Sequence, residues 1–286
     1  MRYRPYTSTG LSSSAITLSL RAGQTAAQAH RLTCAALELG VNSFSFAAGD
    51  IGAAEALRQA VAVAGRRVLI VMLRLDLDGP PFERQVRTAL AASGATYLDA
   101  LMLDQPAPGV LTRSELAELE AVRQARLTTR LALAGDALTT DEYLPKIDFD
   151  VLAIRYNICS GWPERNLLKH AAQRGMTILG YGPHIDAAEP TPSAPVIRGL
   201  ARLIRRPHMA SPEVYAFLDQ TRGWTGPQIT LGYALTEPGL ASVIVEPDSP
   251  QTLESLAEAV ERELPAGVAA QIEIARFAAT ARQSVA

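Results

Sequence analysis

The feature that most constrains the fold is an alternation of short β-branched segments with longer amphipathic ones, which begins near residue 14. This pattern predicts a parallel sheet with a helix after each strand. The eight strand candidates are 14–20, 42–46, 68–74, 98–104, 130–135, 150–156, 176–182 and 241–245. Eight strand and helix units with right-handed crossovers close most simply into a (β/α)₈ barrel, and an open doubly wound sheet is the alternative.

Helix candidates fill the intervals between these strands. Those at 25–40, 53–65 and 82–94 each end on glycine, the residue best suited to the left-handed conformation after a helix. Because 286 residues suit one such barrel, we predict a single domain over residues 1–286. The pattern is broken by a polar N-terminal stretch and by a long Pro-rich and basic connection from about residue 183 to 240.

Composition and charge limit the kinds of partner that this protein is expected to bind. The 27 lysines and arginines nearly balance the 29 acidic residues, and a net charge of -2 gives no general attraction to nucleic acid or to a membrane. No segment has the length and apolarity of a signal peptide or membrane span, so we expect a cytoplasmic protein. No disulfide is expected between Cys34 and Cys159. The expected partner is a small-molecule ligand, with the oligomeric state left open.

The active site of such a barrel is built at the carboxyl ends of its strands. The polar residues predicted there are Ser45, Asp50, Arg74, Asp76, Asp78, Asp104, Asp136, Arg155, Tyr181, His184, Glu246 and Asp248. The predicted mouth is therefore mostly acidic. The two lysines, Lys146 and Lys169, fall in a turn at the opposite end and on a helix, which argues against a Schiff-base mechanism.

Signals for metal and phosphate binding are weak. The histidines show no HExxH spacing, and only His184 is placed to join mouth carboxylates in a divalent metal site. We expect no metal and interpret these carboxylates as solvated. A basic cluster in the long connection has helical spacing and either contacts a phosphate or forms a solvated helix face. It consists of Arg198, Arg202, Arg205 and Arg206, with His208 beside them.

Several segments together resemble the aldo/keto reductase superfamily. They are GVNSFSFAAGDIGAAEALRQAV, LDALMLDQPAP, DFDVLAIRYNICS, MTILGYGP and PGLASVIVEPDSPQTLESL. The resemblance covers nearly the whole chain. Members of this family are (β/α)₈ barrels that bind NADPH and reduce carbonyls with an Asp, Tyr, Lys and His tetrad. The resemblance therefore implies a barrel of the aldo/keto reductase type and points to NADPH as the cofactor to test.

At the tetrad positions the resemblance gives other residues. Ser45 corresponds to the family aspartate, Asp50 lies at or beside the tyrosine, Leu73 corresponds to the lysine and Asp104 to the histidine. An ionised aspartate cannot donate a proton to a developing alkoxide, and its charge repels the growing oxyanion. The resemblance thus implies a protein that is not a conventional carbonyl reductase.

The cofactor contacts implied by the resemblance are also mostly replaced. Gly135-Asp136 stands for a Ser-Asn pair, Ala153 for a glutamine, and Glu246 and its neighbours for a basic residue that binds the adenosine phosphate. Carboxylates that face a phosphate are unfavourable. The retained cofactor-binding candidates are Tyr181, Asn157, Arg202 and Arg205.

Three functions stay open. The first is a small-molecule-binding or regulatory barrel, and the second is a divergent NADP-dependent oxidoreductase with Asp104, Asp50 or water as the proton carrier. The third is a non-redox lyase or isomerase that uses these carboxylates beside Arg74 or Arg155. Arg155 is predicted to point inward, where it either binds a substrate carboxylate or, in the preferred interpretation, pairs with Asp104.

Overall fold

The computed structural model describes residues 1–6, 10–183, 221–265 and 267–283. Eight parallel strands form a closed barrel. They are β3 (Ile16–Ser19), β4 (Ser43–Ala47), β5 (Ile70–Arg74), β6 (Ala100–Asp104), β7 (Leu131–Ala134), β8 (Val151–Arg155), β9 (Thr177–Tyr181) and β10 (Leu240–Val245). The strands follow one another in chain order, and β10 closes the barrel by pairing with both β9 and β3. The predicted (β/α)₈ barrel is confirmed, and each predicted strand segment overlaps one barrel strand, with β4 and β10 each extending one residue beyond the predicted bounds.

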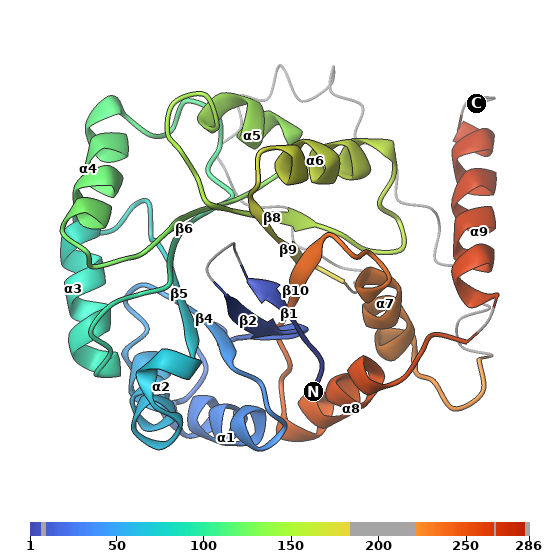
Figure 1. Cartoon of the computed structure of the whole chain (residues 1–286), viewed down its shortest axis with the longest axis horizontal. Helices are drawn as coiled ribbons and strands as arrows, with labels where there is room; N and C mark the ends of the chain where they lie inside the picture. Colours follow the sequence, from blue (N-terminus) through green and yellow to red (C-terminus); the bar gives the residue numbers. More distant parts are fainter. Residues whose placement is uncertain (7–9, 184–220, 266, 284–286) are drawn as a thin grey trace.

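Helices surround the barrel, which Figure 1 shows nearly along its axis. They are α1 (Ala26–Glu38), α2 (Ile51–Ala64), α3 (Phe82–Ser93), α4 (Arg113–Gln124), α5 (Ala137–Tyr143), α6 (Trp162–Gln173), α7 (Gly226–Leu235), α8 (Pro250–Glu261) and α9 (Val268–Gln283), with a short 3₁₀ turn at Arg66–Val68. Helix α9 stands outside the ring, beyond α7 (Figure 1). Gly94 after α3 has a φ of 65°, as predicted for a glycine that ends a helix. None of the helices in the described ranges has the length and apolarity needed to cross a bilayer.

The polar N-terminal stretch, for which the sequence predicted no element, forms an antiparallel hairpin of β1 (Tyr3–Tyr6) and β2 (Leu11–Ser14). Figure 1 shows this hairpin across the centre of the barrel. Tyr6 is fully buried among the interior side chains, with its hydroxyl 3.8 Å from the sulfur of Met72. The hairpin therefore closes the end at which the barrel strands begin and leaves the other end for a site.

The barrel strands have two differently packed faces, because successive side chains in a strand point in opposite directions. On β4, Phe44 and Phe46 pack with the helices, whereas Ser43 points into the barrel. Thr17 joins Ser43 at 2.8 Å and Ser242 at 2.7 Å, a polar layer across the interior. The same alternation decides which residue at each strand end reaches the mouth.

Candidate functional site at the barrel mouth

The mouth of the barrel holds a cavity of about 510 Å³ among the strand ends. Its lining residues are Arg21, Ala22, Ala47, Ala48, Arg74, Leu75, Asp76, Asp104 and Glu246. The charged side chains come from segments far apart in the sequence, and barrel closure brings them together. The lining includes two arginines and three carboxylates, so this cavity is polar and carries both signs of charge.

Arg74, the last residue of β5, is the central side chain of the mouth. Its Nη2 donates to the carbonyl of Leu20 at 3.2 Å, so the side chain reaches past the intervening β4 to the end of β3. Its Nη1 lies 3.5 Å from Glu246 and 3.7 Å from Asp104. These contacts are longer than the 2.7–2.9 Å typical of charge-assisted hydrogen bonds, so the carboxylates neutralise Arg74 without fully using its donors.

Glu246, directly after β10, is held from two other sides. Its Oε1 accepts a hydrogen bond of 2.7 Å from the Ser19 hydroxyl, and its Oε2 lies 3.7 Å from Nε of Arg21. Both partners come from the end of β3, which neighbours β10 in the barrel. The carboxylate is thereby directed across the mouth toward Arg74.

Within the part of the chain that the structure describes, Oγ of Ser45 and Nε of Arg74 are buried at the mouth without a hydrogen-bond partner. Ser45 is fully buried, and it pairs in register with Ser19 of β3 and Met72 of β5. Buried polar groups normally have partners, and each exception calls for a reason such as an absent ligand. A guanidinium nitrogen only donates, so a ligand that satisfies it must present an acceptor oxygen.

The backbone at the mouth is strained beside Asp104. Gln105, the next residue, has a φ of 50°, the left-handed region that residues other than glycine rarely adopt. The backbone N–H of Gln105 donates to the carbonyl of Ala134 at 3.0 Å, and this bond fixes the turn against β7. Strain of this kind gathers at functional sites, where surrounding contacts over-determine the conformation.

The structure corrects the position assigned to Leu73. This residue is fully buried in the cluster that packs β5 against the helices, so its side chain points away from the mouth. The inward residues on this strand are Met72 and Arg74. The third barrel strand therefore presents a cation to the mouth, although an arginine and not a lysine.

Asp50 is a helix cap and is absent from the cavity lining. Its Oδ1 accepts from the backbone N–H of Ala53 at 2.9 Å at the start of α2, while its Oδ2 is buried without a partner. Asp136 caps α5 in the same way, with a bond of 3.0 Å from the N–H of Thr139. Of the predicted mouth carboxylates, Asp104 and Glu246 are the ones that the structure brings together with Arg74.

Arg155 and Tyr181 are register partners at the ends of β8 and β9, and both are half-buried. Arg155 points inward because it shares a face with the interior residue Ala153. Within the described residues, Asp104 pairs with Arg74 and not with Arg155, so the preferred pairing for Arg155 is wrong.

The side-chain amide of Asn157 is hydrogen-bonded within the turn after β8. Its Nδ2 donates to the carbonyl of Gly182 at 3.0 Å, and its Oδ1 accepts from the N–H of Cys159 at 2.9 Å. The side chain is also buried. These bonds give Asn157 a structural role in the turn after β8, and its predicted role in cofactor binding stays a prediction.

Several predicted residues lie outside the described ranges: His184, Arg198, Arg202, Arg205, Arg206 and His208. The hypotheses that place a phosphate at the basic cluster or a metal at His184 therefore stay predictions. Among the side chains that the structure describes, no group of three or more His, Cys, Asp and Glu residues is arranged to hold a metal ion.

Sequence reasoning missed Ser19 and Arg21 at the end of β3. Both contact Glu246, and Arg21 lines the cavity. The signal was present, because Arg21 directly follows the first barrel strand and Ser19 lies two residues after the inward Thr17. The rule that barrel sites lie at the carboxyl ends of the strands therefore applies to the first barrel strand as well.

The comparisons with known proteins agree with this architecture. A barrel of eight parallel strands with a polar cluster at its mouth defines the (β/α)₈ class, which includes many enzymes. The model of the aldo/keto reductase family matches residues 22–276, and the chain belongs to this family.

The solved structures of aldo-keto reductase AKR11C1 from Bacillus halodurans are similar over the whole barrel. The holo form gives a TM-score of 0.72 and the apo form 0.69, each at 18% identity and covering 96% of both chains. At this identity the likeness concerns the fold. A search of curated proteins gave no match.

Proposed function

We propose that this protein binds a small polar ligand at the barrel mouth and is not a conventional carbonyl reductase. The observation that carries the proposal is the arrangement of Arg74 across the mouth, between Asp104 and Glu246 and with Nε unpartnered. Conventional reduction needs a tuned acid that protonates the alkoxide. An arginine does not give up its proton at physiological pH, and neighbouring carboxylates disfavour an oxyanion.

The residues of the described mouth are a poor fit for NADPH, in keeping with this proposal. Asp248, just before α8, accepts a hydrogen bond of 2.7 Å from Thr252, and this bond lowers the pKa of its carboxyl group. An ionised carboxylate thus lies at the start of a helix, a position that would otherwise favour the binding of a phosphate. The side chains of Ala134 and Ala153, inside β7 and β8, offer no hydrogen bond to a carboxamide.

Titration with NADPH and NADP⁺ by fluorescence and calorimetry tests the proposal. We expect no binding tighter than about 10 μM, or about -7 kcal/mol. Tight binding together with NADPH-dependent reduction of a carbonyl panel would instead establish the divergent oxidoreductase, for which the inward position of Tyr181 is the supporting feature. In that case Asp104→His tests whether an imidazole at this position increases the rate.

Ligand binding at the mouth is tested separately by a thermal-shift screen of compact polar molecules. Hits should lose their effect in Arg74→Met and keep it in Lys146→Met, a control whose ammonium pairs with Glu142 away from the mouth. Hits that are unaffected by Arg74→Met would contradict the proposed site.

A specific contact favours a second candidate, a non-redox lyase or isomerase. Asp104 lies 3.7 Å from Arg74, so one carboxylate can remove a proton while the guanidinium stabilises the enolate oxygen. Proton exchange of 2-oxo acids in D₂O, followed by NMR, tests this activity. Exchange that Asp104→Asn abolishes would establish it, and the absence of exchange across the panel would count against it.

A further inference from the structure

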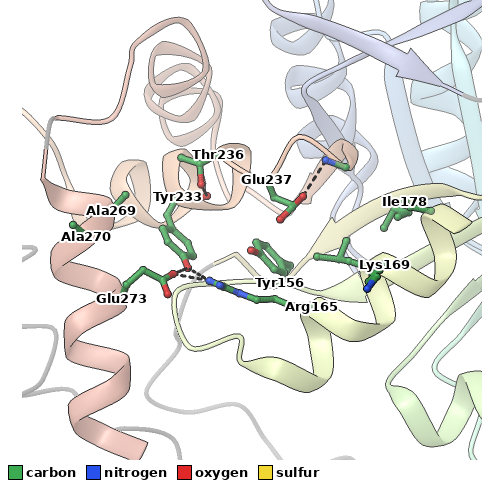
Figure 2. A pocket seen from close by; sticks show the side chains of 13 residues that line it. Tyr156, Arg165, Lys169, Ile178, Tyr233, Thr236, Glu237, Ala269, Ala270 and Glu273 are labelled. Carbon is green, nitrogen blue, oxygen red and sulfur yellow. Dashed lines mark hydrogen bonds and ion pairs between the residues drawn. The ribbon is translucent and has the colours of Figure 1, made fainter.

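A second cavity, of about 460 Å³, lies on the outer wall of the barrel (Figure 2). It is bounded by α6, α7 with the loop that follows it, α9, and the wall formed by β8 and β9. Its polar lining residues are Tyr156, Arg165, Lys169, Tyr233, Glu237 and Glu273. None of these residues lines the mouth cavity, so the two cavities are distinct.

One end of this outer cavity is a satisfied polar network. Glu273 of α9 accepts a bond of 2.6 Å from Arg165 and one of 2.5 Å from the Tyr233 hydroxyl, and it also pairs with Arg276. Burial opposes ionisation of Glu273, yet these hydrogen bonds and charges lower the pKa of its carboxyl group. This end is therefore an ionised wall in which Glu273 is already bonded to Arg165, Tyr233 and Arg276.

The other end has groups without partners. Tyr156 is 3% exposed, and its hydroxyl has no hydrogen bond to the described residues although it lines the cavity. Lys169 makes no ion pair within the described part of the chain, while Glu237 accepts from the N–H of Gly239 at 3.1 Å. Figure 2 shows Tyr156 between Lys169 and the network at Glu273. A buried phenol and an ammonium thus face the same empty space.

Two aromatic faces complete the cavity. The rings of Tyr156 and Tyr233 are nearly parallel, at an angle of 6°, with centroids 6.4 Å apart. A further aromatic ring can pack on this pair by offset stacking or edge-to-face contact, the arrangements that aromatic pairs prefer. Burial, followed by the charge of Glu237, raises the pKa of Tyr156, so the phenol keeps its proton and can donate it in a hydrogen bond at neutral pH.

We propose that this outer cavity binds a planar aromatic carboxylate, with the ring against Tyr156 and Tyr233 and the carboxylate on the Tyr156 hydroxyl and Lys169. The charged lining residues balance, with Arg165 and Lys169 against Glu237 and Glu273. Because Glu273 already pairs with Arg165 and Arg276, Lys169 is the lining cation that is left for an anion. The volume suits a compact molecule of one or two rings.

Calorimetric titration with 2-naphthoate tests the site, and 2-naphthamide serves as the neutral analogue of the same shape. We expect 2-naphthoate to bind about fivefold to tenfold more tightly than the amide, since a hydrogen bond to a charged group is worth at least that factor. Tyr156→Phe, which retains the ring, and Lys169→Met should each weaken 2-naphthoate binding about fivefold. Neither change should affect the amide by more than about twofold.

Two variants serve as matched controls. Lys146→Met removes the only other lysine, and Arg74→Met alters the mouth; neither should change 2-naphthoate affinity. Equal affinity for the acid and the amide, unchanged binding in both Tyr156→Phe and Lys169→Met, or loss of binding in Arg74→Met would each overturn the proposal. Lys169 is exposed and Tyr156→Phe keeps the buried ring, so both variants should fold, which circular dichroism checks.

Discussion

An arginine and an aspartate lie close together at each end of β5 and β6, but the two pairs differ in distance and in burial. Where the strands begin, Arg66 lies 2.7 Å from Asp99, and their side chains are 10% and 3% exposed. Where the strands end, Arg74 lies 3.7 Å from Asp104, and the exposures are 20% and 35%. The first pair is short and buried, whereas the second is long and open to the cavity.

The partners around each pair extend the contrast. Asp99 also accepts from the N–H of Val71, and Arg66 donates to the carbonyls of Leu69 and Tyr97. At the mouth, Nε of Arg74 has no hydrogen-bond partner among the described residues. Closed pairing at the start of the strands therefore stabilises the fold, while incomplete pairing at the mouth leaves donors for a ligand. This division agrees with the rule that barrels bind at their carboxyl ends.

The largest expected effect comes from breaking each pair in turn. Arg66→Met should lower the free energy of unfolding at pH 7 by about 3 kcal/mol or more, because it leaves Asp99 as an uncompensated buried charge. Arg74→Met should change it by less than about 1 kcal/mol, because its carboxylate partners are part-exposed. Urea unfolding followed by circular dichroism measures both values.

The same experiment at low pH sharpens this result. Burial raises the pKa of Asp99 even with Arg66 beside it, so the acid is the preferred buried form once the arginine is lost. The defect of Arg66→Met should therefore shrink as the pH falls toward 4. Equal losses for Arg66→Met and Arg74→Met at pH 7 would remove the distinction between the two ends.

A second prediction concerns Tyr6, which the hairpin places in the barrel near Asp99. Burial, and then the charge of Asp99, raises the pKa of this phenol, so its neutral form is favoured in the fold. The stability from Tyr6 is complete below about pH 10 and declines as the pH rises toward the folded pKa, because the unfolded phenol ionises first. Between pH 10 and 11 the wild type should lose about 1 kcal/mol more than Tyr6→Phe.

Unfolding curves at several alkaline pH values check this prediction. Tyr156 and Tyr233 also have raised pKa values owing to burial, so Tyr6→Phe should reduce the alkaline loss without removing it. A Tyr6→Phe curve parallel to that of the wild type would show that the hairpin phenol ionises freely in the folded state.

The smallest expected effects separate two serines on the same face of β4. Both are fully buried, but Ser43 is hydrogen-bonded to Thr17, whereas the Ser45 hydroxyl has no partner in the described ranges. Ser43→Ala should cost about 1 kcal/mol, because it removes a buried hydrogen bond. Ser45→Ala should leave stability unchanged or raise it by up to about 1 kcal/mol, because it removes an unsatisfied group.

Thermal and urea unfolding of the two serine variants, each compared with the wild type, measures the difference. Equal destabilisation by both changes would mean that Ser45 has a partner in solution and that the mouth is more completely paired than the geometry indicates.

Much of the barrel was predictable because its signal is periodic. Strand and helix alternation located the barrel strands, and Gly94 marked the end of α3. The hairpin was not predicted, because β1 and β2 are short, polar and separated from the periodic part of the chain. The packing of this hairpin depends on the contact of Tyr6 with the barrel interior, which the local sequence pattern does not predict.

The site was harder to predict from the sequence, because strands buried on both faces show no polar alternation. In VLIVMLR nothing distinguishes the inward Met72 from the outward Leu73, so the sequence does not show that Leu73, the residue matched to the family lysine, points away from the mouth. Asp50 illustrates another difficulty. An aspartate before a helix is as suitable for a cap as for catalysis; here it caps α2, and its catalytic role stays a prediction.

The end of β8 places two consecutive side chains on opposite sides of the barrel wall. Arg155 faces the interior, and Tyr156 packs on the outer side. Their Cα atoms are held about 3.8 Å apart by the peptide unit. A ligand that shifts the backbone at Arg155 or Tyr156 must also move the other of these two residues. At this point the inner and outer surfaces of the barrel are therefore mechanically linked across the thickness of a single chain.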